Sequence, residues 1–219
     1  MGSGESLSVD EGVPTVDQVK VSIIYYSATG TTYTLAQAIA EGAEKAGALV
    51  TLKKVRELAP DEAIATNEGW QQHRLETQDV PEATPDDIVG ADAVIFGSPT
   101  RYGNVAAQLK QFIDTLGPQW SQGLLADKVY SGFTSSSTQH GGQESTLLAL
   151  YTTVHHFGGI VVAPGYTDPV KFGDGNPYGT SFVSGAGPEP DQVAIDAAVY
   201  QGKRVAEIAA ALKTGLAAA

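Results

Sequence analysis

The chain has 219 residues, of which 42% are hydrophobic and 17% charged, and it contains no cysteine. This length and composition fit one soluble globular domain, and the lack of cysteine excludes disulfides, thiolate catalysis and cysteine-bound metals. The net charge of −12 would repel a phosphate backbone, so we expect no nucleic-acid partner. No apolar run approaches the ~18 residues of a membrane span, and the first residues lack the features of a secretion signal. We therefore expect no membrane insertion and a cytoplasmic location.

The first half of the chain predicts two strands and one long helix. A β-rich run over residues 19–26 predicts the first strand, and apolar residues at helical spacing over 33–45 predict a helix. Residues 50–54 predict a short second strand. The polar segment 56–80 is ambiguous and shows only one short helical stretch, at 61–65.

The middle of the chain continues the alternation. Thr84 begins a helix, because a capping hydroxyl is followed by proline at the first helical position and by acids in the first turn. A continuous apolar run at 93–97 is typical of a buried parallel strand. Residues 106–115 predict a helix and residues 129–133 the next strand.

The last part adds a helix at 144–156, a fifth strand at 160–163 and a final helix at 191–212. Between them, residues 166–190 are rich in glycine and proline and predict a long excursion. Five strands alternating with helices predict an α/β fold, with a parallel sheet covered on both faces. Ligands bind such sheets beyond the carboxyl ends of the strands.

The first strand leads directly into a hydroxyl-rich turn at the start of a helix. Unpaired N–H groups and the positive end of the helix dipole suit a phosphate there, and hydroxyls add donors without charge. No lysine completes a Walker loop, and no GxGxxG motif is present. A hydroxyl-rich helix cap without a ligand is an equal alternative for this turn taken alone. Its residues are Ser27, Ala28, Thr29, Gly30, Thr31 and Thr32.

Two more loops of this character follow the third and fourth strands. The first combines an aromatic ring and a guanidinium group, which could face a planar ligand, in Pro99, Thr100, Arg101, Tyr102, Gly103 and Asn104. The second brings small hydroxylated residues before glycines, in Ser135, Ser136, Ser137, Thr138, Gln139, His140 and Gly141. Each loop alone could be an ordinary surface turn. Their coincidence at one sheet edge indicates a ligand site.

The sequence resembles the WrbA family, which is named for tryptophan-repressor binding and acts as NAD(P)H:quinone oxidoreductases. The resemblance spans about residues 19–213. It rests on stretches that occur in family order, namely YYSATGTT, FGSPTRYGN, TSSSTQHGGQES, VHHFGGIVVAPGY and GNPYGTS.

The resemblance implies a flavodoxin-like, doubly wound sheet of five parallel strands in the order 2-1-3-4-5, within three α/β/α layers. Residues 19–215 would form one domain, and residues 1–18 a disordered tail or an expression remnant. FMN would bind non-covalently, with its phosphate in loop 27–32. The isoalloxazine would lie between loop 99–104 and the residues Ser135, Ser136, Ser137, Thr138, Gln139 and Gly141.

The resemblance also implies a homotetramer, in which Trp120 and the His155–His156 region serve a neighbouring subunit's flavin. Trp120 and Tyr102 would form the substrate slot, and His156 would reach the cofactor. Thr29 stands where relatives often carry an aromatic residue, and Gln139 and His140 replace glycines. Since adjacent residues of a helix point about 100° apart, only one of the two histidines would face the flavin.

The implied reaction is a ping-pong sequence, in which NAD(P)H reduces the flavin and a quinone then takes two electrons. FMN carries this chemistry, so no side chain is needed as acid, base or nucleophile. An electron-carrier flavodoxin is the main alternative, and a non-enzymatic regulator is another. No metal site is expected, because the histidines and acids lack ligand spacing.

Overall fold

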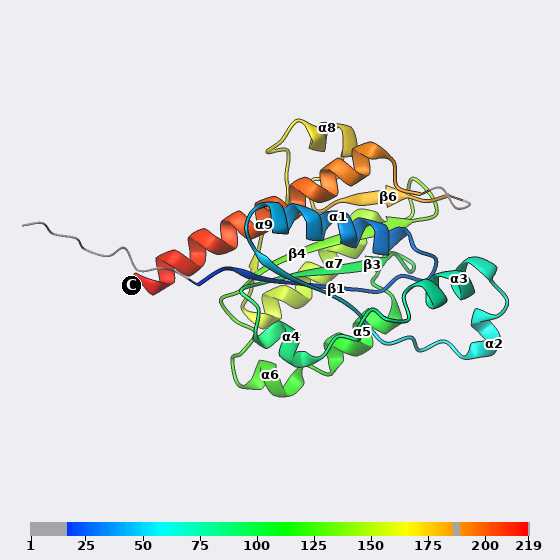
Figure 1. Cartoon of the computed structure of the whole chain (residues 1–219), viewed down its shortest axis with the longest axis horizontal. Helices are drawn as coiled ribbons and strands as arrows, with labels where there is room; N and C mark the ends of the chain where they lie inside the picture. The colour runs from blue at the N-terminus through cyan, green and yellow to red at the C-terminus, as the bar shows by residue number, and fades with distance from the viewer. Residues whose placement is uncertain (1–16, 186–188, 219) are drawn as a thin grey trace, which may run out of the picture.

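A parallel sheet forms the middle of three layers in the computed structural model, which describes residues 17–185 and 189–218 (Figure 1). The strands are β1 (Lys20–Tyr25), β2 (Leu49–Lys54), β3 (Ala93–Pro99), β4 (Val129–Ser136), β5 (Ile160–Val161) and β6 (Ser181–Val183). The helices are α1 (Thr31–Lys45), α2 (Asp61–Ile64), α3 (Glu68–Glu76), α4 (Pro85–Val89), α5 (Ala107–Asp114), α6 (Gly117–Ser121), α7 (Gln143–Phe157), α8 (Val170–Asp174) and α9 (Gln192–Ala217).

The strand order is β2-β1-β3-β4-β5, as the sequence predicts, but the sheet has six strands and not five. β5 pairs with Val129 and Tyr130 at the start of β4, whereas β6 pairs with residues 134–136 at its end. Two short strands therefore lie one after the other along β4, in the fifth position of the sheet. The segment that joins them contains α8. The sequence missed β6 because it is only three residues long and lies among glycines and prolines. Part of the predicted excursion (186–188) and most of the predicted tail (1–16) lie outside the described residues.

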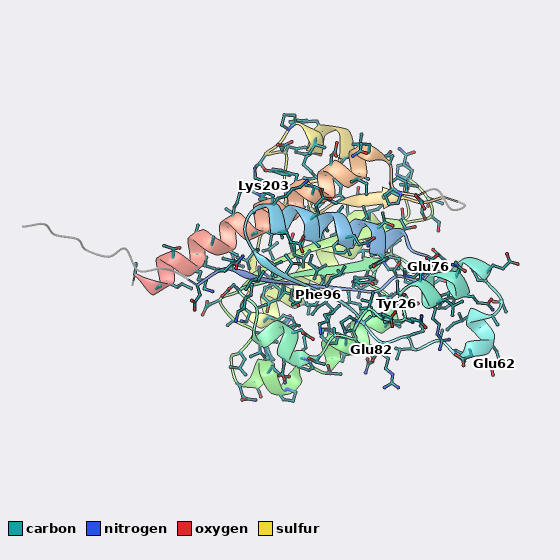
Figure 2. The ribbon with its side chains drawn as sticks, in the orientation of Figure 1. Tyr26, Glu62, Glu76, Glu82, Phe96 and Lys203 are labelled. Atoms are coloured by element: carbon teal, nitrogen blue, oxygen red, sulfur yellow. The ribbon has the colours of Figure 1, made fainter. Side chains whose placement is uncertain are left out.

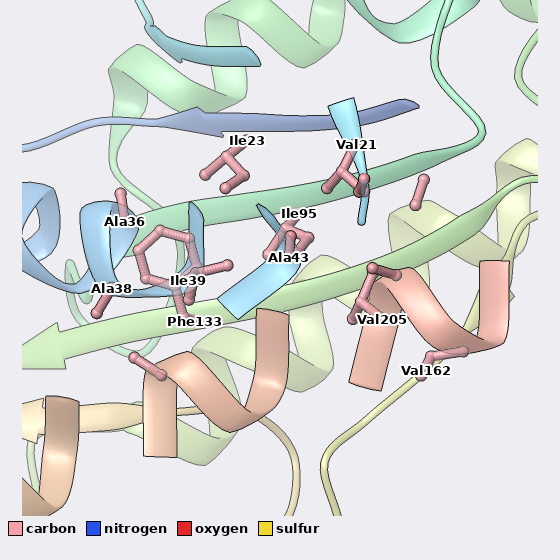
Figure 3. Close-up of a cluster of buried hydrophobic side chains, with 14 of the residues drawn as sticks. Val21, Ile23, Ala36, Ala38, Ile39, Ala43, Ile95, Phe133, Val162 and Val205 are labelled. Atoms are coloured by element: carbon pink, nitrogen blue, oxygen red, sulfur yellow. The ribbon is translucent and has the colours of Figure 1, made fainter. Parts of the chain in front are cut away.

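Helices cover both faces of the sheet, with α1 and α9 on one side and α4, α5, α6 and α7 on the other (Figure 1). Side chains alternate along β1 accordingly. Val21, Ile23 and Tyr25 join the core under α1 and α9, which Figure 3 shows in close-up. Ile24 and Tyr26 join the core on the opposite face. β3 and β4 are buried along their whole length, as expected of central parallel strands.

α1 and α9 pack so closely that their backbones touch. A Cβ atom on Gly202 would lie 1.9 Å from the carbonyl oxygen of Ile39, and one on Gly42 would lie 1.9 Å from that of Val199. Only glycine permits this approach, since real Cβ atoms essentially never come within 3.0 Å of another heavy atom. The contact fixes α1, whose first residues lie beside the candidate site.

The segment 56–80 is more ordered than the sequence predicts. In addition to α2 it contains α3, whose first turn is capped by Asn67: the side chain accepts a hydrogen bond from the N–H of Trp70 at 3.0 Å. The sequence missed α3 because the helix is polar and buries only His73. The predicted start of α4 is confirmed, since Thr84 and Asp87 form a capping box.

Candidate functional site

The carboxyl ends of β1, β3 and β4 border a cavity of about 590 Å³. Arg101 is the only charged side chain among the described residues that line it, and none of those residues is acidic. The lining residues are Ser27, Ala28, Thr29, Thr31, Thr32, Asn67, Trp70, Pro99, Thr100, Arg101, Tyr102, Ser135, Ser136, Ser137, Thr138, Gly141 and Ser184. Although the chain has a net charge of −12, no carboxylate in this lining would repel a bound anion.

The loop from Ser27 to Thr32 presents the N-terminus of α1 to this cavity. Gly30 precedes the helix with φ of 103°, a conformation that other residues rarely adopt, and its N–H donates to Ser27 Oγ at 3.1 Å. The N–H groups of Thr31, Thr32 and Tyr33 have no helical acceptor because they belong to the first turn. The loop thus offers backbone and hydroxyl donors at the positive end of a helix.

The loop after β3 is a tight turn with an aromatic tip. Arg101 and Asn104 pair through their backbones, with the N–H of Arg101 donating to the carbonyl of Asn104 at 2.7 Å. Tyr102 lies between them with φ of 54°, and its side chain is fully exposed. Its ring is therefore free to cover a flat ligand that enters the cavity.

Hydrogen bonds hold the three loops together. Thr32 Oγ1 lies 3.1 Å from Ser135 Oγ, which joins the loop after β1 to the end of β4. The N–H of Thr100 donates to the carbonyl of Ser135 at 2.8 Å, and Thr146 Oγ1 of α7 donates to Thr100 Oγ1 at 2.8 Å. The hydroxyls that line the cavity are thus positioned before any ligand binds.

α3 supplies a wall that the sequence did not predict. Trp70 lies at this wall, and its indole N–H donates to Glu57 Oε2 at 3.1 Å. The same carboxylate accepts hydrogen bonds from Tyr26 at 2.9 Å and Gln108 at 2.7 Å. Burial raises the pKa of Glu57, but the hydrogen bonds from the Ala59 and Leu58 N–H groups, Gln108 and Tyr26 lower it by more, so the net shift is downward. An ionised Glu57 therefore holds the indole in place.

The structure brings most of the predicted residues together at the cavity. Gly30, Gly103, Asn104 and Gln139 belong to the same loops without lining it. Two predicted residues lie elsewhere: Trp120 on α6 donates its indole N–H to the carbonyl of His156 at 2.8 Å. His156 is near the end of α7, whose start borders the site, so the rise of the helix places it about 20 Å away.

Three lining residues were not predicted, namely Asn67, Trp70 and Ser184. Asn67 and Trp70 lie in the polar segment 56–80. A tryptophan shortly after an asparagine that can cap a helix was the one feature of the sequence that could have indicated them. Ser184 follows β6, and its N–H donates to the carbonyl of Ser136 at 2.7 Å. That position could be found only by recognising the split fifth strand.

The fold and the site together define a flavodoxin-like α/β protein whose first strand ends in a hydroxyl-rich loop at the start of a helix. A family model described as NADPH-dependent FMN reductase matches residues 19–168. The chain belongs to this family. Among the described residues, none of the helices is both long and apolar enough to cross a membrane.

Curated relatives are similar over nearly their whole length. A protein of Deinococcus radiodurans, named NAD(P)H dehydrogenase (quinone), is 46% identical over 89% of this chain and 97% of its own. A protein of the same name from Sinorhizobium fredii is 46% identical over 88% of this chain and 98% of its own.

Solved structures agree with these relatives. The flavodoxin, WrbA-like protein from Agrobacterium tumefaciens matches with a TM-score of 0.63 and 28% identity over 89% of this chain and 99% of its own. A Megasphaera elsdenii flavodoxin matches with a TM-score of 0.52 and 17% identity over 85% of this chain and 98% of its own. The predicted membership of the WrbA family and the predicted flavodoxin-like fold are confirmed.

Proposed function

We infer that this chain is an FMN-dependent NAD(P)H:quinone oxidoreductase. The observation that carries this conclusion is the cavity of about 590 Å³, whose lining is rich in hydroxyls and free of acids, in a chain similar over nearly its full length to proteins named NAD(P)H dehydrogenase (quinone). The cavity fits FMN because it combines unpaired helix N–H donors at one end with an exposed aromatic ring at another. When bound, FMN supplies the capacity to accept hydride from NAD(P)H and to reduce a quinone by two electrons.

The three loops have different roles in this proposal. Loop 27–32 binds the phosphate with the N–H groups of the first turn of α1 and with its hydroxyls. Loop 99–104 borders the flavin ring, with Arg101 facing an anionic or carbonyl edge and Tyr102 bounding the substrate slot. Residues 135–139 and Gly141 border the opposite edge of the ring. Residues 19–215 act as one FMN-binding domain.

We also propose that the enzyme is a cytoplasmic homotetramer. Trp120 is 54% exposed and contacts His156 away from its own subunit's cavity, which supports a role in a neighbouring subunit's site. Light scattering after size-exclusion chromatography tests this assembly directly. A mass of about four chains is expected, and a monomer at micromolar concentration would contradict the proposal.

The test of function is an absorption spectrum of the protein with FMN, recorded anaerobically after NADPH or NADH and then after benzoquinone. Bleaching of the flavin bands by the nicotinamide and their recovery with the quinone are expected. An accumulating one-electron form during gradual reduction, without bleaching by either nucleotide, would favour an electron carrier. Failure to bind FMN would refute the assigned loops.

A further inference from the structure

His73 of α3 is a buried histidine whose ring nitrogens form no hydrogen bond with any described residue. Only 6% of its surface is exposed. Its ring packs against that of Tyr33 at a centroid distance of 5.6 Å, and Tyr33 stacks in turn on Tyr25 at 5.4 Å. The ring nitrogens can therefore interact with a ligand bound at the adjacent loop.

The ring points at the loop assigned to the cofactor phosphate. A Cβ atom on Gly30 would have His73 Nδ1 as its nearest neighbour, at 3.7 Å. The first turn of α3 lies beside the same loop, since a Cβ atom on Gly69 would lie 3.9 Å from Thr29 Cγ2. His73 also lines a second cavity of about 380 Å³, which shares Ser27 and Trp70 with the first. Solvent protons can reach the ring through this cavity.

The groups around His73 leave it short of a negative partner. Its neighbours are the phenol rings of Tyr33 on α1 and Tyr25 on β1, and the cation Lys54 on β2. Glu76 lies about one turn further along α3 and is labelled beside that helix in Figure 2. Burial lowers the pKa of His73, Glu76 partly offsets this, and Lys54 lowers the pKa again. The other titratable residues of the second cavity are Tyr26, Arg56, Glu57, Asp61, Arg74 and Glu82.

Several of those groups are already paired with residues other than His73. Arg74 forms an ion pair with Asp61 at 2.6 Å, and Lys54 Nζ donates to the carbonyl of Thr77 at 2.5 Å. The carboxylate of Glu57 accepts the hydrogen bonds described above. Among the described residues, Arg56 lines the second cavity without an ion pair as well, but it is exposed, whereas His73 is buried with its ring beside Gly30.

We propose that His73 is a positioning residue for the phosphate of FMN, and that its imidazole takes up one proton from solvent as the phosphate enters loop 27–32. The proposal rests on the function inferred above. No electron moves in this step: one N–H bond forms on the ring, and the new cation faces the phosphate across the Gly30 backbone. The cofactor affinity that His73 contributes is therefore largest at low pH and fades as pH rises.

The size of the effect follows from Coulomb's law at short range. The attraction between an imidazolium and a phosphate held close together in a partly buried site is large enough to change affinity about tenfold, which corresponds to about 1.4 kcal/mol. We expect His73→Gln to weaken FMN binding by up to about tenfold at the acid end of the pH range and hardly at all at pH 8.5. Riboflavin lacks the phosphate, so its affinity should be equal for the two proteins at both values.

The experiment measures dissociation constants by quenching of flavin fluorescence, for FMN and riboflavin, with wild-type protein and His73→Gln from pH 5.5 to 8.5. The second proton of a phosphate monoester also titrates near pH 6, and comparing the two proteins at each pH cancels that contribution. A second measurement needs no variant. The imidazole signals of His73 in the wild-type protein are titrated by NMR alone, with FMN and with riboflavin, and only FMN should raise its pKa, by about one unit.

The outcomes separate this proposal from the proposed function. Tight FMN binding with a wild-type to variant ratio that does not change with pH, or a His73 pKa that FMN leaves unmoved, overturns the role of His73 and leaves the enzyme assignment intact. An equal loss of FMN and riboflavin affinity would show a purely structural role and also overturns it. Failure of the wild-type chain to bind FMN overturns both.

Discussion

The close contact between α1 and α9 makes Gly202→Ala the most severe test of the fold that holds the site. The new methyl group would lie 1.9 Å from the carbonyl oxygen of Ile39, 2.8 Å from its carbonyl carbon and 3.1 Å from the amide nitrogen of Ala43. All three atoms are backbone, so no side chain can rotate away. The helices must instead separate.

Restoring an ordinary contact of 3.4 Å requires the helices to move apart by about 1.5 Å. Overpacking typically costs about 1–3 kcal/mol, and the cost here is at or above the upper end because only backbone atoms oppose the new methyl group, whereas replacing glycine by alanine in a helix returns about 1 kcal/mol. We expect Gly202→Ala to lower the free energy of unfolding by about 2 kcal/mol or more. Because α1 begins at the phosphate loop, we also expect weaker FMN binding.

Gly215→Ala is the matched control, because it makes the same chemical change in the same helix where a Cβ atom meets nothing within 4 Å. It should stabilise the chain by about 0.5 kcal/mol. Urea unfolding at 25 °C, followed by far-UV circular dichroism, measures both, and equal slopes would show that the unfolded states are comparable. If Gly202→Ala unfolds at the same urea concentration as wild type or a higher one, the helices are not packed as described.

Two further substitutions test one partly buried carboxylate and one fully buried ion pair. Glu57→Gln should destabilise the chain by about 1 kcal/mol at pH 7, because it weakens charge-assisted hydrogen bonds to Tyr26 and Trp70. The pKa of Glu57 is lowered in the folded state, so its contribution exists above the unfolded-state pKa near 4.5 and is lost as pH falls; urea titrations at pH 7 and pH 3.5 should show the difference shrinking. Asp174→Ala should cost about 3–5 kcal/mol, since Lys171 is fully buried against that carboxylate, and Lys171→Met in the same chain should recover much of the loss in urea titrations.

The regular part of the fold could be predicted because burial is periodic there. β3 and β4 are buried on both faces and read as unbroken apolar runs, and the stripe of α1 is visible from its spacing. β6 and α3 could not be predicted in this way. β6 depends on its pairing with residues 134–136, which lie more than forty residues away in the chain. α3 buries a histidine and not an apolar face.

The candidate site likewise contains residues that could be predicted from the sequence and residues that could not. The three loops that follow strands carry their own signals, namely hydroxyls, glycines and one aromatic–arginine turn, so sequence reasoning located them. Trp70 and Asn67 reach the cavity only because α3 folds back beside loop 27–32, and its contacts with Thr29 and Gly30 are too local to leave a pattern in the sequence.

The acidity of the chain explains why the site has this chemistry. A phosphate loop built from lysines would be neutralised by neighbouring carboxylates in a protein with 25 acidic and 13 basic residues. Backbone N–H groups and hydroxyls avoid that competition, since they cannot form ion pairs. A neutral imidazole avoids this competition as well. It becomes a cation only when an anion binds close enough to favour the protonated form. In our proposal His73 is neutral until the phosphate binds and is charged only then. A lysine in the same place would be charged at all times and would form ion pairs with the carboxylates nearby.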